Sequence, residues 1–394
     1  MNILLLYLKN NPELILGIIF FLCLLTYAII RFPVYRLTGR HFANTNGAED
    51  KHKPISVVVT THNQSFVLEK NLEIIATQDY PNYEVIVVND ASTDETSDII
   101  KRIENKYPHV RHTFTPVSAR YVSHSKLAIT LGIRSAKNEW ILLTEGDCHP
   151  VSNHWISQMA AACDKEHDFV LGYSNFERHQ TLHSNRISLD RLIHQLRFFH
   201  AAGAHIKSKA VGGNNCNMAL RKSVFLEHKG FSGNLNLLGG EDLLFLDATA
   251  QAGRTGIVIS QSAIILQQIP FMVQQWHTFK LFQTEAARHL SRSGIFEHFL
   301  WALSSTAMYA SILLATAIIT LCIIKGEFIY TATVLFLSLL TFVLDLILFN
   351  HTAGFFEERK FYILYPCYNL TQPFFNLNYR IQSHFQRHSL MRGV

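Results

Sequence analysis

The stretch that decides the fold is residues 55–94, ISVVVTTHNQSFVLEKNLEIIATQDYPNYEVIVVNDASTD. It opens with the β-branched run Ile55–Thr60, continues with helical periodicity over Val67–Thr77, and returns to a β-branched run at Tyr83–Val88. Short uninterrupted apolar runs of this kind are typical of strands buried on both faces. A strand, a helix and a second strand in this order predict the start of a parallel α/β sheet.

The alternation of strand and helix continues after this stretch. We expect a helix over Asp94–Tyr107, a strand over Val110–Phe114, a helix over Leu127–Ala136, a strand over Trp140–Thr144 and a helix over Ser152–Cys163. A strand and a helix in every segment of about 25 residues predict a doubly wound, mostly parallel sheet. Ligands of such sheets collect beyond the carboxyl ends of the strands, so the residues that follow each strand are the candidates for chemistry.

Polar side chains follow the first two strands. Thr60, His62 and Asn63 come at the end of the first strand, and Asp90 directly follows the second. An aspartate after a strand is commonly a helix cap. Asp90 comes immediately after the apolar run, at a place where it could instead accept an N–H of a bound base.

Two acidic pairs occur farther along the chain. Glu145 and Asp147 flank Gly146 after the fourth strand, where residues two apart share a face and the glycine permits a bend. Carboxylates that converge in this way suit Mg²⁺ or Mn²⁺. Glu241 and Asp242 precede an apolar helical run, where they could complement the helix dipole or supply a general base. The sequence contains neither GxxxxGK[ST] nor GxGxxG, so no P-loop or dinucleotide fingerprint is available.

Three long apolar runs lie outside this domain. Leu14–Ile30, Phe299–Ile324 and Phe328–Phe349 each have roughly the length that a membrane-spanning helix requires. Lys325 and Glu327 predict a tight hairpin between the second and the third run. Asp345 interrupts the third run; a buried acid there would mark function, but its place near the end of the run favours an interfacial residue.

Basic residues flank these runs and predict the orientation of the chain. They are Arg31, Arg36 and Arg40 after the first run, Arg288 and Arg292 before the second, and Arg359 and Lys360 after the third. The positive-inside rule then predicts an integral membrane protein with the N-terminus outside and residues 31–298 in the cytoplasm. A bacterial inner membrane is the expected location. Phe361–Phe375, which contains two prolines, is interpreted as interfacial, with a third C-terminal membrane helix as the alternative.

Composition excludes several classes of protein. The 394 residues are 48% hydrophobic and 16% charged, which excludes a disordered chain. A net charge of +5 is too mild to argue for a nucleic-acid partner. Six cysteines without a CxxC pair favour neither a disulfide framework nor a zinc module. The predicted organisation is an anchor (1–32), a linker (33–53), a catalytic domain (54–293), a transmembrane hairpin (294–350) and an interfacial or cytoplasmic segment (351–394), with no signal for an oligomeric state.

The chain resembles glycosyltransferase family 2, the inverting GT-A-type enzymes that use nucleotide sugars. The matching segments occur in the family's order: VVVTTHN (57–63), QDYPNYEVIVVNDASTDET (78–96), SKLAITLGI (125–133), WILLTEGDCHP (140–150), GGNNCNMALRKS (212–223) and GGEDLLFL (239–246). The resemblance covers about residues 55–290, and flanking membrane spans are common among membrane-bound members of the family.

The resemblance implies a role for each matching residue. It assigns Thr60, His62, Asn63 and Asp90 to the nucleotide, Lys126 to the neighbourhood of the diphosphate, Asp147 to the metal, and Asp242, beside Glu241, to the catalytic base. Glu145 departs from the family's usual aspartate, and it could accept from the ribose or ligate the metal. Arg288 and His289 stand where polymerising members carry QxxRW, and we expect them near the donor.

The function implied is transfer of a sugar from a nucleotide sugar, with a UDP-sugar expected, to a lipid-linked or membrane-proximal glycan acceptor in the presence of Mg²⁺ or Mn²⁺. A processive polysaccharide synthase and an inactive nucleotide-sugar-binding membrane partner are the alternatives. The altered QxxRW motif argues against the synthase. The apolar stripe of Ser188–Ala202 favours core packing over contact with the membrane surface.

Overall fold

The structure is a computed structural model, which describes residues 12–36, 53–116, 123–177, 181–203, 209–268 and 273–387. The chain divides into two compact units. The helical unit comprises Met1–Thr38, Phe296–Gly354 and Arg359–Pro373. The α/β unit comprises Gly39–Ile295, Phe355–Glu358 and Phe374–Val394.

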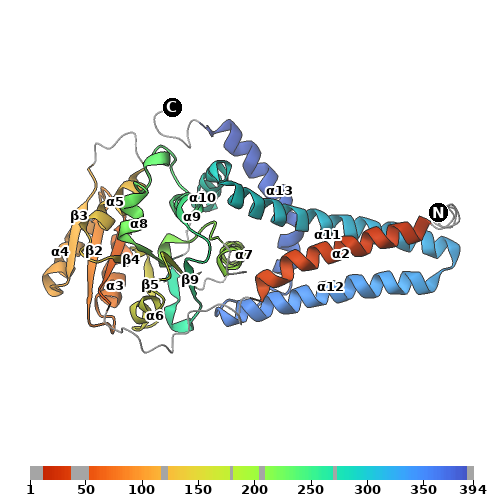
Figure 1. Ribbon diagram of the computed structural model, residues 1–394, viewed down its shortest axis with the longest axis horizontal. Coiled ribbons are helices and arrows are strands. Elements are labelled where there is room, and N and C mark those ends of the chain that lie inside the picture. The colour runs from red at the N-terminus through yellow and green to blue at the C-terminus, as the bar shows by residue number, and fades with distance from the viewer. Residues whose placement is uncertain are drawn as a thin grey trace. The chain divides into compact units, whose positions relative to one another are not determined.

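The α/β unit is built on a seven-stranded sheet with the order β3-β2-β1-β4-β8-β6-β9 (Figure 1). These strands are β1 (Ile55–Thr61), β2 (Tyr83–Asn89), β3 (Val110–Phe114), β4 (Trp140–Glu145), β6 (Phe169–Gly172), β8 (Met218–Arg221) and β9 (Thr255–Val258). All neighbouring pairs are parallel except the two made by β8. A smaller sheet contains β5 (Cys148–Pro150), β10 (Ile265–Gln267) and β7 (Ser174–Phe176). The predicted mostly parallel α/β sheet is confirmed.

Helices alternate with these strands along the chain. They are α3 (Ser65–Ala76), α4 (Thr96–Lys106), α5 (His124–Ser135), α6 (Trp155–Ala161), α7 (Leu182–Gly203), α8 (Lys222–Glu227), α9 (Glu241–Thr249) and α10 (Val273–Ala286). Helix α6 is shorter than the predicted Ser152–Cys163. The apolar stripe of α7 is fully enclosed, since Leu189, Leu192, Ile193 and Leu196 are 0% exposed, which supports the core interpretation.

Successive residues of the central strand face opposite layers of the unit. Val57 and Val59 of β1 belong to one hydrophobic cluster with residues of α3 and α4. Val58 faces α5, where a Cβ added to Gly132 would lie 2.4 Å from its Cγ1. Because β1 is buried on both faces, its sequence is a nearly unbroken run of β-branched residues.

The parallel register brings the carboxyl ends of three strands together. Thr60 pairs with Glu145 of β4, and Thr61 pairs with Asn89 of β2. The polar residues that follow these strands therefore start from one edge of the sheet, as the sequence predicted.

The helical unit contains three helices that are long and apolar enough to cross a membrane, among the residues that the structure describes. They are α2 (Pro12–Tyr35), α11 (Arg292–Lys325), which begins in the α/β unit, and α12 (Phe328–Phe355), and Figure 1 shows them side by side. The predicted hairpin is present, with Gly326 at φ +75° between α11 and α12. Helix α13 (Leu364–Phe385) follows and has no such apolar stretch.

The structure shows that Asp345, which the sequence favoured as an interfacial residue, has a buried side chain. Helix α12 continues to Phe355, beyond the end of the apolar run, so Asp345 lies ten residues before the end of the helix. Its side chain is enclosed by neighbouring helices of the unit, and the residue is 6% exposed.

Candidate active site

A tight turn follows the carboxyl end of β4 and contacts the end of β1. The Gly146 N–H donates to the Thr60 carbonyl oxygen over 2.8 Å. A Cβ on Gly146 would lie 2.6 Å from both Thr61 Oγ1 and Gln64 Oε1, so a side chain does not fit here. The glycine therefore allows the acidic residues on either side of it to lie close to the sheet edge.

The carboxylates of Glu145 and Asp147 converge on one side chain. The Nε2 group of Gln267, on β10, donates to Glu145 Oε2 over 3.2 Å and to Asp147 Oδ2 over 3.1 Å. Burial raises the pKa of both carboxyl groups, and the Asp147 charge raises that of Glu145 further. A cation bound between these two carboxyl groups would stabilise their ionised forms.

The donor atoms at this point fit Mg²⁺ or Mn²⁺, which prefer oxygen ligands. Softer ligands are close by, because ligand atoms of Glu145, Cys148 and Cys216 lie within 4.8 Å of one another. Burial raises the pKa of the Cys148 thiol well above its usual range, which disfavours the thiolate form that binds soft metals. Asp147 and Glu145 are therefore the residues that would hold a hard cation.

The second acidic pair begins α9. Gly240 precedes it with φ +75°, and a Cβ there would lie 2.4 Å from Ala286 Cβ. Ser125 donates its hydroxyl proton to Glu241, whereas Asp242 Oδ1 accepts from the Leu243 N–H over 2.9 Å. Burial, with the Glu241 charge as the second cause, raises the pKa of Asp242 to about 7. A carboxyl group with this pKa can accept a proton near neutral pH.

A cavity of about 280 Å³ is lined by Glu145 of the first acidic pair and by both residues of the second. Three of its lining residues were predicted from the sequence: Glu145, Glu241 and Asp242. Lining residues that the sequence did not single out include Arg191, Asn214, Asn215, Gln267, Trp276, Phe279 and Phe282. The volume is slightly below the range of about 300–1,000 Å³ that is usual for small-molecule sites.

Arg191 is the main functional candidate that sequence reasoning missed. It projects from α7, stacks its guanidinium 3.6 Å from the Phe176 ring centroid and donates from Nη2 to Gln267. Its Nη1 group is buried and has no partner among the described residues. An unsatisfied guanidinium N–H in a cavity suits a phosphate oxygen. Residue type alone did not mark Arg191, because it lies on the polar side of a helix interpreted as core.

Residues predicted to bind the nucleotide form hydrogen bonds at the ends of β1 and β2. His62 Nδ1 donates to the Asp90 carbonyl oxygen over 2.5 Å, and Asn63 adopts a left-handed φ of 52°. The Asp90 carboxylate accepts from Thr115 Oγ1 over 2.6 Å and from His124 Nδ1 over 3.0 Å. None of the predicted nucleotide residues at these strand ends lines the 280 Å³ cavity, so their contact with a nucleotide stays a prediction.

Lys126 is fully buried, and it holds the loop that leads to the second acidic pair. Its Nζ donates to the carbonyl oxygens of Asn234 and Leu237 over 2.8 Å and of Gly239 over 3.1 Å. Desolvation by burial lowers its pKa. All three ammonium protons have protein partners, so the structure gives Lys126 a positioning role, and its predicted place near the diphosphate stays a prediction.

We expect Lys126→Met to destabilise the protein by about 3 kcal/mol, because it leaves buried carbonyl groups without a donor. For a unit of this size the midpoint of thermal unfolding should fall by about 6–12 °C. Lys101→Met is the matched control, since its side chain is 63% exposed. An unchanged unfolding temperature together with weaker donor binding would instead support a direct contact with the diphosphate.

Arg288 and His289 surround a buried carboxylate and do not line the cavity. Glu285 is 1% exposed, with Arg288 Nε 3.3 Å from its Oε2 and His289 Nε2 4.0 Å from its Oε1. Arg387 adds a hydrogen bond of 3.1 Å to the same carboxylate. These contacts join the end of α10 to the C-terminal part of the unit, and the predicted contact of Arg288 and His289 with the donor stays a prediction.

The sheet order and the acidic pairs at its carboxyl edge define a class, the α/β proteins with a GT-A-type fold. Residues 56–228, under half of the chain, match the sequence model described as glycosyl transferase family 2, and the resemblance to that family is confirmed over these residues.

Known proteins with related sequences match only part of this chain. A dolichyl N-acetyl-α-D-glucosaminyl phosphate 3-β-D-2,3-diacetamido-2,3-dideoxy-β-D-glucuronosyltransferase of Methanococcus voltae is 30% identical over 101 residues, which are 24% of this chain and 30% of that protein. Poly(ribitol-phosphate) β-N-acetylglucosaminyltransferase TarS of Staphylococcus aureus is 28% identical over 118 residues, 29% of this chain and 20% of that protein. The match thus spans less than a third of either relative.

A solved structure shares the fold over most of the chain. The mannosyltransferase PcManGT from Pyrobaculum calidifontis, in complex with GDP-Man and Mn²⁺, superposes with a TM-score of 0.51. The alignment covers 86% of this chain and 98% of that one at 15% identity, a likeness that concerns the fold alone.

Proposed function

We propose that this chain transfers a sugar from a nucleoside diphosphate sugar to a hydroxyl group of a lipid-linked or membrane-proximal acceptor, with inversion at the anomeric carbon. The observation that carries the proposal is the cavity that Glu145 and Asp242 line together. Asp147 adjoins it through the shared contact of the two carboxylates with Gln267. The match of residues 56–228 to glycosyl transferase family 2 supports the reaction type.

Asp242 is the proposed general base. The acceptor oxygen attacks the anomeric carbon from the face opposite the diphosphate, and its proton passes to the Asp242 carboxylate. The bond between the anomeric carbon and the diphosphate oxygen breaks, and its electron pair leaves with the nucleoside diphosphate. A positioned base typically contributes about 10²–10⁴-fold to such a step.

Positive charge beside the diphosphate would stabilise the leaving group. The unpartnered Nη1 of Arg191 can donate to a phosphate oxygen. Mg²⁺ or Mn²⁺, held by Asp147 and Glu145, would supply further positive charge to the departing diphosphate. PcManGT, which shares the fold, was solved with Mn²⁺.

Nucleotide recognition is assigned to the ends of β1 and β2. Asp90 is proposed to accept an N–H of the base, with Thr60, His62 and Asn63 beside it, and a UDP-sugar is the proposed donor. The aromatic part of the cavity suits a sugar ring, because the ring centroids of Trp276 and Phe279 lie 5.2 Å apart and both residues line it. The helices of the helical unit would place the reaction at a membrane, with the α/β unit in the cytoplasm.

The test is release of nucleotide from a panel of UDP-, GDP-, CDP- and dTDP-sugars by detergent-purified full-length protein, with Mn²⁺ and a membrane lipid extract as acceptor. We expect release from one donor, with a single sugar added to a lipid product. Products that lengthen with time would favour the processive synthase. Metal-dependent binding of a nucleotide sugar without turnover of any donor or acceptor would favour the inactive partner, and absence of both would overturn the proposal.

The pKa of Asp242 predicts the pH dependence of the reaction. Because the base works deprotonated and its pKa is raised to about 7, kcat/KM should rise with pH and reach half of its plateau near pH 7. One pH unit lower, activity should be about tenfold below the plateau. Glu241→Gln should move the rising limb to lower pH, because it removes the neighbouring charge that raises the pKa. A rising limb at pH 4–5 in the unmodified protein would contradict this assignment.

A further inference from the structure

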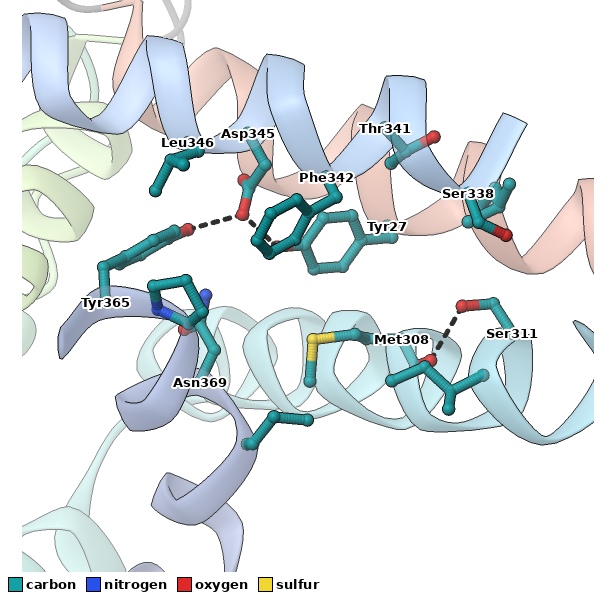
Figure 2. A pocket seen from close by; sticks show the side chains of 14 residues that line it. Tyr27, Met308, Ser311, Ser338, Thr341, Phe342, Asp345, Leu346, Tyr365 and Asn369 are labelled. Atoms are coloured by element: carbon teal, nitrogen blue, oxygen red, sulfur yellow. Dashed lines mark hydrogen bonds between the residues drawn. The ribbon is translucent and has the colours of Figure 1, made fainter. Parts of the chain in front are cut away.

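The helical unit contains a cavity of about 300 Å³, bounded by α2, α11, α12 and α13 (Figure 2). Most of its wall is apolar, with Leu24, Met308 and Phe342 among the lining residues. Part of the rim is open, since Ile312 is 45%, Phe342 49% and Leu370 44% exposed. In a membrane-spanning bundle, side chains exposed in this way face the lipid chains, so the cavity is accessible from the bilayer.

A buried carboxylate lies in this apolar wall. Tyr27 and Tyr365 donate their hydroxyl protons to Asp345 Oδ2 over 2.7 and 2.9 Å, and Figure 2 shows both rings directed at it. Asp345 Oδ1 is buried and has no hydrogen-bond partner in the described part of the chain. A buried acceptor without a donor is unfavourable, and more so when it is charged. The site therefore lacks one hydrogen-bond donor.

Arg31 lies within the same bundle. The positive-inside pattern placed it at the membrane boundary, but it is 1% exposed, with its guanidinium 3.4 Å from the Trp301 ring centroid. Its Nε donates to Ser304 Oγ over 2.8 Å, and its Nη2 donates to Ser305 Oγ over 3.0 Å. Side chains of α11 thus satisfy two of the three guanidinium nitrogens.

A chain of tyrosine hydroxyls links this arginine to the carboxylate. Arg31 Nη1 donates to the Tyr35 hydroxyl over 3.4 Å, the Tyr35 and Tyr365 hydroxyls lie 2.9 Å apart, and Tyr365 donates to Asp345. The buried acid and base therefore belong to one network, and their charges balance. The missing donor at Asp345 does not need to bring a positive charge with it.

We propose that the cavity binds an uncharged lipid with a free hydroxyl group, of the long-chain alcohol or diacylglycerol type, whose hydroxyl donates to Asp345 Oδ1. A phosphate headgroup would meet the negative carboxylate, and an ammonium headgroup would add a charge to a network that is already balanced. The protons of Ser311 and Thr341 are used by carbonyl oxygens of their own helices, so these side chains can accept hydrogen bonds from a ligand but offer no donor of their own. The apolar wall suits the hydrocarbon chain.

The inference does not depend on the sugar transfer, because its test measures binding alone. Full-length protein in detergent micelles is incubated with dioleoylglycerol, dioleoyl phosphatidate or oleylamine, and the bound lipid is counted by native mass spectrometry. We expect one dioleoylglycerol per chain, with at least about tenfold preference over either charged lipid, which corresponds to about 1.4 kcal/mol. A preference for dioleoyl phosphatidate or oleylamine, or no saturable binding, would overturn the proposal.

Two variants and one control locate the site. Thr341→Phe should fill the cavity, and Thr333→Phe, on an exposed position of the same helix, is the matched control. Asp345→Asn keeps one oxygen for the two tyrosines and replaces the unpartnered oxygen with an amide donor. We expect Thr341→Phe and Asp345→Asn to weaken dioleoylglycerol binding at least about tenfold while the control binds normally. Equal binding by Thr341→Phe and Thr333→Phe would place the lipid elsewhere and overturn the proposal.

Discussion

Asp242→Asn is expected to lower kcat by about 10²–10⁴-fold while binding of the nucleotide sugar is retained. The amide has nearly the shape of the carboxylate and can still accept from the Leu243 N–H through its oxygen. It cannot take the acceptor's proton, so the loss concerns the chemical step. Turnover is measured as nucleotide release, and binding of the donor is measured by calorimetry on the same preparation.

Asp98→Asn is the control for this experiment. Asp98 also lies in the first turn of a helix, α4, and its side chain is 73% exposed. The control removes the same charge from an equivalent helical position far from the cavity, so its activity should match that of the unmodified protein. If Asp242→Asn loses no more activity than Asp98→Asn, Asp242 is not the base.

Asp147→Asn is expected to remove metal dependence together with about 10²–10³-fold of the activity, because charge stabilisation at the leaving group contributes on this scale. The amide retains one oxygen, but it lacks the charge that attracts a divalent cation. Chelation of the metal should lower the activity of the unmodified protein by a similar factor, and added Mn²⁺ should restore it. Mn²⁺ binding is measured directly by electron paramagnetic resonance.

Glu145 provides a graded comparison at the same point of the site. Glu145→Asp keeps a carboxylate and should retain metal binding, whereas Glu145→Gln should weaken it. Asp79→Asn, whose side chain is 70% exposed, serves as the charge control. Full activity of Asp147→Asn in the presence of a chelator would show that transfer proceeds without a cation at this point.

Much of the fold was predictable from local patterns. Val110–Phe114 was predicted with the bounds that the structure gives, and Ile55–Thr60 differs from β1 by one residue. These strands can be predicted from the sequence because a strand buried on both faces is apolar along most of its length. Ser152–Cys163 was predicted less well, since the last turns of a short helix depend on packing that the pattern does not contain.

The candidate site was predictable where the chemistry depends on neighbours in the chain. Glu145 and Asp147 lie two residues apart, so the backbone alone brings them close together. Gln267, which both carboxylates contact, is 120 residues from Asp147, and no local pattern marks it. Arg191 was missed for the same reason, because the orientation of a polar side chain on a buried helix depends on what packs against that helix.

The sequence by itself determined the alternation of strands and helices, the three apolar helices, and the places where acidic residues follow a strand or begin a helix. All of these are properties of periodicity and short-range spacing, which the chain carries locally. Only the tertiary structure decided that Arg31 and Asp345 are buried in one network, since Tyr27 and Asp345 are 318 residues apart. A charge is stable inside an apolar bundle only when partners from distant helices satisfy it, and that pairing exists only once the chain has folded.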